Sequence, residues 1–261
     1  MRRHGFPEDA FPVIVAHRGA SSTHPENTLP AFEAAIALGA PVVELDVRLT
    51  ADGVPVVMHD PDVARTTDGR GFVHELTAAE IAGLRAGKGG VAAHVPTLAE
   101  ALACLSGRAA VAMEIKSIPG EPGYDPEGEP IVEAAVAEVE RTGFAGPVLV
   151  ISFNPRSIRR ARELAPEVAT GLLSTEHVDP RDALALAREE GHDLVLPGVR
   201  ALLPAGPGFV AEAHAAGVRV GTWTVDDAAR IRELLAWGVD AIASNDPGTA
   251  LGALAAFRGS M

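Results

Sequence analysis

Cysteine, aromatic residues and clustered positive charge are scarce in this chain of 261 residues. The single Cys104 excludes an internal disulfide, and because it falls within a helical pattern we expect it to pack in the core. Aromatic residues make up only 4% of the chain, so each one beside a candidate site carries weight. Basic residues form no run and the formal net charge is −13, which argues against nucleic acid or an anionic membrane surface as a partner.

Long apolar runs are also missing from the sequence. No stretch reaches the length that a membrane span requires, so we expect no membrane anchor. The start, MRRHGFPEDAFP, has two arginines but no apolar run after them and therefore shows no signal peptide. These features predict a cytoplasmic protein. With 47% hydrophobic residues, the chain can bury the core of one large domain or two small ones.

Valine-rich runs alternate with alanine- and leucine-rich amphipathic runs along the whole chain, a pattern typical of alternating strands and helices. The predicted strands cover residues 13–16, 42–47, 111–115, 148–152, 168–173, 194–196, 218–222 and 241–244. The predicted helices cover residues 29–38, 97–106, 131–142, 155–165, 180–190, 207–216, 226–237 and 247–257. Capping residues support these boundaries, for example Thr97-x-x-Glu100 at the start of one helix and Gly107 at its end.

Eight consecutive strand-helix units predict an α/β protein that folds as a (β/α)8 TIM barrel, with residues 1–261 as one domain. A doubly wound open sheet is the alternative, but no glycine-rich fingerprint follows a strand as a nucleotide-binding fold would require. Residues 60–96 interrupt the alternation, and we interpret them as a small insertion after strand two. Residues 118–130, rich in proline and glycine, form a predicted loop after strand three.

The stretch 42–60, VVELDVRLTADGVPVVMHD, predicts a β-hairpin that gathers charge on one face. Glu44 and Asp46 fall at period two on the face opposite the valines, and Asp-Gly at 52–53 is a strong turn signal. A two-residue loop would place His59 across from Asp46. Carboxylates side by side repel one another unless a cation lies between them, so the hairpin indicates either a metal site with a proton carrier beside it or a solvated amphipathic face.

Further polar and aromatic residues follow other predicted strands. Because the loops that follow barrel strands form the active face of the fold, we expect these residues to lie together in one site. Together with the hairpin they make up the candidate set His17, Arg18, Glu44, Asp46, His59, Glu114, Lys116, Phe153 and Trp223.

Each member of this set has a role that suits its chemistry. Glu44, Asp46 and Glu114 offer only oxygen ligands, which suit one divalent cation, Mg²⁺ or Ca²⁺, with Mn²⁺ as a further candidate. The alternative is that these acids form structural ion pairs with Arg18, Arg48 or Lys116.

His17 and His59 are candidate proton carriers, because an imidazole titrates close to neutral pH. Arg18 and Lys116 can hold a phosphate or a carboxylate. Trp223 is interpreted as an apolar wall of the pocket, and Phe153 as a second substrate contact.

The sequence, with these residues in this order along the chain, resembles the glycerophosphodiester phosphodiesterase family. The resemblance rests on AHRGAS at 16–21, PENTLPAF at 25–32, VELDVRLTADGVPVVMHDP at 43–61, RTTDGRGFV at 65–73, VPTLAEAL at 95–102 and MEIK at 113–116. Weaker similarity continues through ISFN at 151–154, VGTWTV at 220–225 and DAIASNDP at 240–247. Where the family often ends its last strand with Thr-Asp, this chain has Ser244-Asn245, and we predict no role for that pair.

The resemblance implies a barrel with a small insertion after strand two, and metal-dependent hydrolysis of glycerophosphodiesters to glycerol 3-phosphate and an alcohol. It implies His17 and His59 as the acid/base pair and the three carboxylates as metal ligands. Arg18 and Lys116 would hold the phosphate, and Asn27 would order the first loop. The nucleophile is either the 2-hydroxyl of the substrate glycerol or a water molecule.

Two other functions remain open at this stage. A lysophospholipase D or a glycerophosphoinositide phosphodiesterase could use the same site, and a wider apolar mouth would indicate one. A non-catalytic barrel could bind a metal or a sugar phosphate, although no candidate histidine or ligand is missing from the sequence. The expected partner is a small-molecule glycerophosphodiester in each catalytic case.

Overall fold

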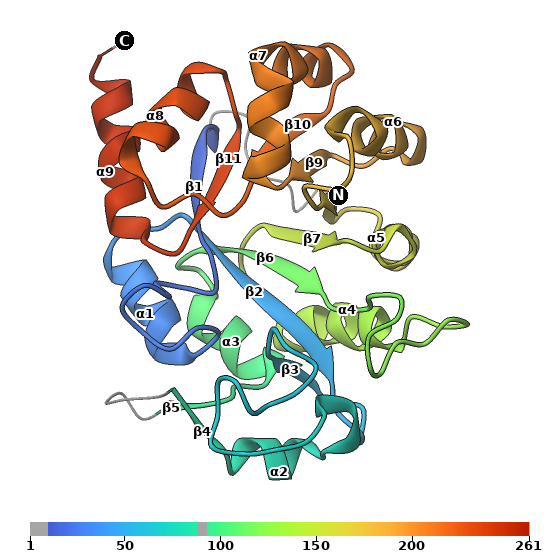
Figure 1. Cartoon of the computed structure of the whole chain (residues 1–261). Helices are drawn as coiled ribbons and strands as arrows, with labels where there is room; N and C mark the ends of the chain where they lie inside the picture. Colours follow the sequence, from blue (N-terminus) through green and yellow to red (C-terminus); the bar gives the residue numbers. More distant parts are fainter. Residues whose placement is uncertain (1–9, 88–92, 261) are drawn as a thin grey trace.

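A closed ring of parallel strands forms the centre of the molecule in the computed structural model, which describes residues 10–87 and 93–260 (Figure 1). The strands are β1 (Val13–Ala16), β2 (Val42–Leu49), β6 (Ala110–Ile115), β7 (Val148–Ser152), β8 (Ala169–Ser174), β9 (Leu194–Pro197), β10 (Arg219–Thr222) and β11 (Ala241–Ser244). Their order around the ring is β1-β2-β6-β7-β8-β9-β10-β11, and β1 pairs with β11 to close it. The predicted (β/α)8 barrel is therefore confirmed.

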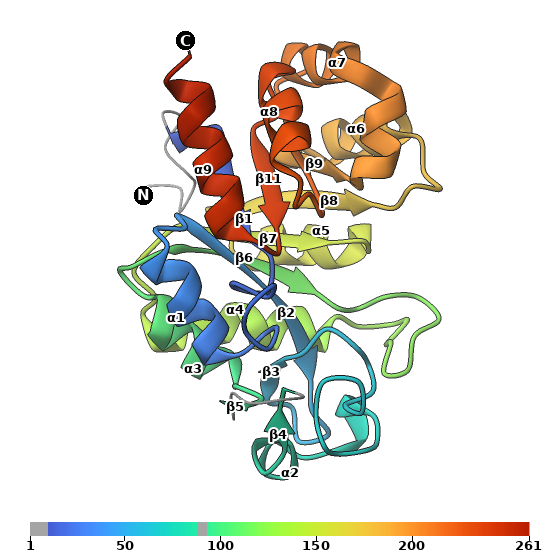
Figure 2. The same ribbon diagram turned by 60° about the vertical axis from the view of Figure 1, so that its left-hand side comes forward.

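Helices cover the outside of the barrel (Figures 1 and 2). They are α1 (Leu29–Ala37), α3 (Leu98–Leu105), α4 (Pro130–Thr142), α5 (Pro155–Leu164), α6 (Pro180–Glu190), α7 (Val199–Ala215), α8 (Ala228–Ala236) and α9 (Pro247–Arg258). The expected caps are present: Thr97 and Glu100 form a capping box, and Gly107 adopts the left-handed φ of 71° just after α3. Within the described residues, no helix is both long and apolar enough to cross a lipid bilayer.

Two apolar layers result from the alternation along each strand. Val43, Leu45 and Val47 of β2 point outward and pack under the helices in the larger core. Inward-facing residues such as Val42 and Ala112 pack inside the ring in a second, smaller cluster. Cys104 on α3 packs only at the edge of the larger core and is half-buried, because its Sγ lies 3.4 Å from Glu33 Oε1 near the surface.

The hairpin after β2 differs from its predicted register. Strand β3 (Pro55–Val57) pairs antiparallel with β2 so that Val57 lies opposite Val47. The loop has three residues rather than two, because Gly53 adopts a φ of +78° and its N–H donates to Thr50 O at 3.0 Å. Met58 N therefore donates to Asp46 O at 2.9 Å, and the prediction that His59 lies across from Asp46 is wrong.

The insertion that follows the hairpin has its own small core and lies beside the end of β2 (Figure 2). It contains the 3₁₀ helix η2 (Val73–Glu75), α2 (Ala78–Ala82), β4 (Arg85–Ala86) and β5 (Ala93–His94), while residues 88–92 of the predicted 60–96 segment lie outside the described residues. Val63, Ile81 and Val95 are buried together in this core. The insertion is thus a packed unit that flanks one side of the barrel mouth.

Helix α7 begins earlier than the predicted 207–216. It starts at Val199 and is interrupted at Gly206, whose φ of 71° and ψ of −176° are not helical. Pro207 then begins the second helical stretch at a position that proline tolerates, because the N–H it lacks would be unpaired there. The sequence prediction found only this second stretch, since the prolines at 204 and 207 mask the first.

Candidate active site

The three predicted carboxylate ligands converge at one end of the barrel because of the pairing between β2 and β6. Glu44 and Asp46 alternate with outward-facing residues, so both side chains point into the ring. Glu114 lies directly beside Asp46 in the parallel register. All three side chains are buried, and each offers an oxygen within 4.8 Å of the others.

Asp46 is the most heavily paired of the three acids. Its carboxylate lies 2.9 Å from Lys116 Nζ and 3.1 Å from Arg18 Nε, and it accepts a hydrogen bond from Asn27 Nδ2 at 2.7 Å. Burial alone would raise the pKa of Asp46, but the positive charges of Lys116 and then Arg18 hold that pKa well below its usual range. Asp46 is therefore ionised. The alternative that the acids form structural ion pairs with Arg18 or Lys116 thus applies to Asp46.

The negative charges of Glu44 and Glu114 are less well balanced by nearby positive charges than the negative charge of Asp46. Burial, together with the charge of Asp46, raises the pKa of Glu44 to about 8. Burial also raises the pKa of Glu114 to about 7, although Lys116 donates a short hydrogen bond to it. Glu44 Oε2 accepts from Arg18 N at 2.9 Å, whereas its buried Oε1 has no hydrogen-bond partner among the described residues.

This arrangement fits a hard divalent cation. Three oxygen donors within 4.8 Å of one another match the coordination that Mg²⁺, Ca²⁺ and Mn²⁺ accept. A buried carboxylate oxygen without a partner is costly, and a positive charge at this point would remove that cost. Ion pairs with Arg18 and Lys116 alone leave Glu44 Oε1 unpaired, so they do not account for the whole cluster.

His17 reaches the carboxylates from the turn that follows β1. Arg18 adopts a left-handed φ of 57°, and a Cβ on Gly19 would lie 2.6 Å from the Ala31 backbone, so only glycine fits there. His17 Nε2 lies 3.9 Å from Glu44 Oε2, and Nδ1 lies 2.8 Å from an oxygen of Asn245. Burial and then the charge of Arg18 lower the pKa of His17, which favours the neutral imidazole.

His59 enters from the exit of the hairpin, just beyond β3. Its Nδ1 lies 2.6 Å from Asp60 Oδ1, and its backbone carbonyl accepts from Arg48 Nε at 2.8 Å. Burial lowers the pKa of His59, while the charge of Asp46 raises it. The two histidines thus differ in their partners: His59 has a carboxylate at Nδ1 and His17 has an amide.

The site opens into a cavity of about 170 Å³ whose two sides differ in character. Its charged lining residues lie on or just after β1, β2, β3 and β6, whereas the strands from β7 to β11 contribute mainly apolar side chains. Phe153 and Trp223 meet edge to face, with ring centroids 5.4 Å apart, and Trp223 Nε1 donates to Leu196 O at 2.9 Å.

The structure brings the predicted site residues together. The cavity is lined by His17, Arg18, Glu44, His59, Glu114, Lys116, Phe153 and Trp223. Asp46 does not line the cavity and lies behind it, fully buried, where it pairs with Lys116 and Arg18. His59 reaches the cavity even though the predicted hairpin register is wrong.

Several contacts around the site were missed by the sequence analysis. Asp60, next to His59 in the quoted motif, contacts that ring, and the adjacency was the available signal. Arg65 pairs with both Asp60 and Glu26, and Glu26 pairs with Arg18. Asn27, predicted to order the first loop, also bonds directly to Asp46. The contact between His17 and Asn245 had no local signal, because 228 positions separate the two residues.

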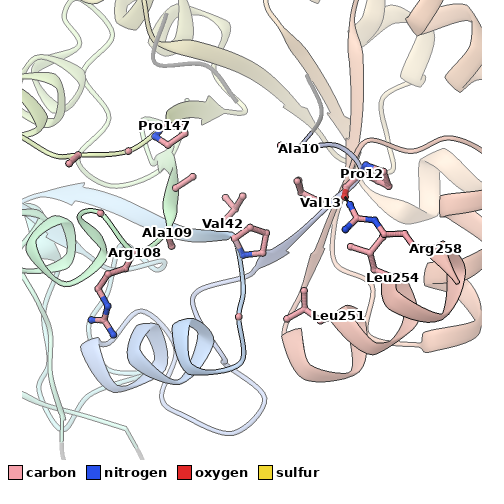
Figure 3. Close-up of a pocket in the computed structure, with 16 residues that line it drawn as sticks. Ala10, Pro12, Val13, Val42, Arg108, Ala109, Pro147, Leu251, Leu254 and Arg258 are labelled. Carbon is pink, nitrogen blue, oxygen red and sulfur yellow. Dashed lines mark hydrogen bonds between the residues drawn. The ribbon is translucent and has the colours of Figure 1, made fainter. Parts of the chain in front are cut away.

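A larger cavity, of about 680 Å³, lies at the opposite end of the barrel (Figure 3). Val13, Val42 and Pro147 line it at the starts of the strands, and Leu254 of α9 faces them. No acid or histidine is among its described lining residues. The cations there are Arg108, which is paired with Glu33, and Arg258, which donates to a backbone carbonyl. Although this cavity is larger, its described lining therefore offers no group that could act as a general acid, a general base or a metal ligand.

Comparisons with known proteins agree with the site. The sequence model of the glycerophosphoryl diester phosphodiesterase family matches residues 17–249. A glycerophosphodiester phosphodiesterase from Caldanaerobacter subterraneus subsp. tengcongensis is 36% identical, over 91% of this chain and 95% of its own. A glycerophosphodiester phosphodiesterase from Bacillus subtilis is 30% identical, over 90% of this chain and 84% of its own.

Solved structures show the same relationship. A phosphodiesterase from Oleispira antarctica, solved in complex with the product sn-glycerol-3-phosphate, superposes with a TM-score of 0.83 at 28% identity, covering 95% of this chain and 98% of its own. With a matching barrel, a family match over most of its length and relatives that cover nearly all of it, the chain belongs to the glycerophosphoryl diester phosphodiesterase family.

Proposed function

We propose that this protein hydrolyses glycerophosphodiesters to glycerol 3-phosphate and a free alcohol. The observation that carries the proposal is that two histidines, two basic side chains and carboxylates of the buried acidic cluster line the same cavity. The related Oleispira phosphodiesterase, which was solved with sn-glycerol-3-phosphate, supports this choice of product. The partner is therefore a small molecule, and we propose that residues 1–261 act as one cytoplasmic barrel domain.

Glu44, Asp46 and Glu114 would hold one divalent cation, Mg²⁺ or Ca²⁺ in the first place and Mn²⁺ as the further candidate. Support comes from the oxygen donors within 4.8 Å of one another and from the unpaired Glu44 Oε1. When bound, such an ion supplies positive charge that stabilises the phosphoryl oxygens as negative charge builds on them.

Arg18 and Lys116 would hold the phosphate beside the acidic cluster. Both side chains line the cavity, and both already lie beside Asp46, which fixes their positions. The guanidinium is held from two directions, because its Nε lies 3.1 Å from Asp46 and its Nη1 donates to Glu26, while the Arg18 backbone N–H donates to Glu44. A cation that is held in place before substrate binds loses little freedom on binding, which favours phosphate recognition.

His17 and His59 would carry the protons of the reaction. A phosphodiester repels nucleophiles because it is negatively charged, and its alkoxide is a poor leaving group. One histidine therefore removes a proton from the attacking hydroxyl, and the other donates a proton to the departing oxygen. The attacking hydroxyl belongs either to the substrate glycerol or to water. Both rings border the cavity, and burial lowers the pKa of each, which keeps a proton acceptor available at neutral pH.

A second candidate substrate class follows from the apolar side of the cavity. Leu149, Ile151 and Leu173 face the same space as the charged residues, and the paired rings of Phe153 and Trp223 line it as well. A lysophospholipid, whose glycerol carries an acyl chain, would bury that chain against these residues. This variant of the proposal uses the same chemistry, but the glycerol keeps its acyl chain, so the product is a lysophosphatidic acid in place of glycerol 3-phosphate.

The proposal is tested by assaying glycerophosphodiesters for release of glycerol 3-phosphate and lysophospholipids for release of lysophosphatidic acid, with each divalent cation added in turn. Exhaustive chelation should abolish turnover, and Mg²⁺, Ca²⁺ or Mn²⁺ should restore it. A bound cation should also raise the melting temperature, because it binds only the folded arrangement of the carboxylates.

Glu44→Gln supplies the matched variant for the metal site. It should lose the thermal shift on adding the cation, whereas Glu33→Gln, at a surface acid paired with Arg108, should keep it. Full turnover after chelation, with no metal found by elemental analysis, would disprove the proposed ligand set. Release of no glycerol 3-phosphate from any diester would disprove the proposed reaction.

A further inference from the structure

A chain of three side chains leads from His17 to a carboxylate outside the cavity. His17 follows β1, Asn245 follows β11, and Asp226 lies between β10 and α8. His17 Nδ1 is 2.8 Å from Asn245 Oδ1, and Asn245 Nδ2 donates to Asp226 Oδ2 at 2.9 Å. The sequence alone predicts no role for Asn245, and the proposed hydrolysis does not use Asp226.

The orientation of the Asn245 amide is fixed by what Asp226 can do. The Asp226 carboxylate accepts from Asn245 N at 2.7 Å and from Ser244 Oγ at 2.9 Å, as well as from Asn245 Nδ2. A carboxylate accepts hydrogen bonds and does not donate them, so the amide NH₂ has to face Asp226. The amide oxygen then has to face His17.

This orientation decides which ring nitrogen of His17 carries hydrogen. An amide oxygen is only an acceptor, so Nδ1 must be the donor in the 2.8 Å contact. In the neutral ring Nε2 is then the unprotonated nitrogen. Nε2 is also the nitrogen that lies toward the acidic cluster, 3.9 Å from Glu44 Oε2.

We propose that Asp226 and Asn245 are positioning residues that hold His17 in the Nδ1–H tautomer, so that His17 exchanges protons with substrate only through Nε2. The inference rests on the proposed function, because it names the residues that prepare one of its two proton carriers. Asp226 acts through Asn245, and neither residue lines the cavity. A neutral histidine in the other tautomer would present an N–H at Nε2 and could not accept a proton there.

The test compares single variants with a double variant that exchanges the amide and the carboxylate. Asn245→Leu removes the acceptor, and Asp226→Asn frees the amide to turn its NH₂ toward His17. Each should lower kcat about 10- to 100-fold, the range that loss of the hydrogen-bond partner of a metal-bound histidine produces, with KM changed less than threefold. Asn245→Asp combined with Asp226→Asn restores an acceptor at Nδ1 and a donor behind it, so kcat should return to within a few-fold of the unmodified protein.

The tautomer itself is read from the ¹⁵N chemical shifts of the His17 ring, which need no turnover. The unmodified protein should show hydrogen on Nδ1, and Asp226→Asn should move population to the Nε2–H form. Thermal unfolding of every variant separates misfolding from a local effect. If the unmodified protein releases no glycerol 3-phosphate, the proposed function fails, while the ring shifts still report on the inference.

Asp240→Asn provides the matched control, because it removes a carboxylate that contacts His214 Nε2 at 2.7 Å at the other end of the barrel. That variant should keep full activity. Hydrogen on Nε2 of His17 in the unmodified protein, or normal kcat in Asn245→Leu, would overturn the inference. Failure of the folded double variant to recover would also overturn it, since both hydrogen bonds are then present without effect.

Discussion

The two sides of the barrel mouth are built from the same kind of strand and differ sharply in what they present. The side formed by β1, β2 and β6 presents Glu44, Glu114 and two basic residues to the cavity. The side formed by β7, β8 and β9 presents Leu149, Leu173 and Leu196. One side holds charge in fixed positions, and the other excludes water and shapes the space, which strengthens every charge interaction across the cavity.

On the neighbouring strands β6 and β7, the charged side and the apolar side of the cavity differ at one inward-facing position. Glu114 lies beside Ile151 in the parallel register, and Ala112 lies beside Leu149. A single inward-facing position therefore separates the charged side from the apolar side. The contrast between the two sides implies that substitutions on the charged side change kcat, whereas substitutions on the apolar side change KM.

The largest expected effect comes from removing either histidine. Asparagine or glutamine at His17 or His59 should lower kcat about 100-fold or more, the usual scale for losing a general acid or base, without unfolding the protein. Steady-state kinetics measures the fall in kcat, and thermal unfolding checks that each variant is still folded. His214→Asn should stay within a few-fold, since His214 lies outside the cavity.

Activated esters sharpen this comparison further. With p-nitrophenolate as the leaving group, the variant that lacks the acid should recover much of its turnover, while the variant that lacks the base stays slow. Near-normal turnover of natural diesters in both histidine variants would contradict the two-histidine mechanism.

Arg18→Lys should have the next largest effect. An ammonium group cannot reproduce the guanidinium fork, so catalytic efficiency should fall at least about tenfold, equivalent to about 1.4 kcal/mol of transition-state stabilisation. The geometry gives a second reason, because the guanidinium lies between Asp46 and Glu26 and a lysine cannot contact both in the same way. Kinetics equal to those of the unmodified protein would show that Arg18 is only scaffolding.

Trp223→Leu probes the apolar side and should act mainly on KM. It removes the edge-to-face contact with Phe153 and the hydrogen bond to Leu196 O. The ring contact contributes about 0.5–1.5 kcal/mol within the protein. We expect the substrate to lose apolar packing of the same order when the indole is removed, so KM should rise about two- to tenfold while kcat changes little. A 100-fold fall in kcat at unchanged KM would instead place Trp223 among the groups that take part in the chemistry.

The smallest expected effect concerns pH and stability at the rim of the charged side. Partial burial opposes ionisation of Asp60, but hydrogen bonds from Arg65 and then His59 lower its pKa from 3.8 to about 2. A lowered pKa stabilises the folded state above pH 3.8, and that stabilisation is lost as the pH falls through about 2.

Urea unfolding at pH 6 and at pH 3 measures this contribution in the unmodified protein and in Asp60→Asn. The difference in unfolding free energy should be under about 1 kcal/mol, because water screens this half-exposed group, and it should shrink in high salt. A difference between the two proteins that does not change with pH or salt would contradict an electrostatic origin.

The sequence was sufficient to predict the barrel, because period-two strands, amphipathic helices and terminal glycines all indicate the same fold. It also predicted the charged and aromatic residues that line the cavity, apart from Asp46, which lies behind it, since the ends of parallel strands must meet at one edge. The register of the hairpin was not predictable in this way. The choice between a two-residue and a three-residue loop depends on the conformation of Gly53, which the Asp-Gly pair does not fix.

The hydrogen-bond partners of the two histidines were likewise not predictable from local sequence patterns. Asp60 could be suspected from its place next to His59, although adjacency alone does not say that the two side chains meet. Asn245 could not be connected with His17, because their contact depends on closure of the barrel between β1 and β11. Local patterns predict elements and faces, and only the closed ring determines which distant side chains touch.

Arg65 links the insertion to the barrel in a way that restricts how this enzyme could be re-engineered. It donates to Glu26 at 2.7 and 2.9 Å and also pairs with Asp60, so one side chain joins the first loop to the exit of the hairpin. An insertion grafted from a relative would have to provide an arginine at the same point. Without one, Glu26 and Asp60 would lose their shared partner, and the graft could fold well yet leave His59 and Arg18 poorly held.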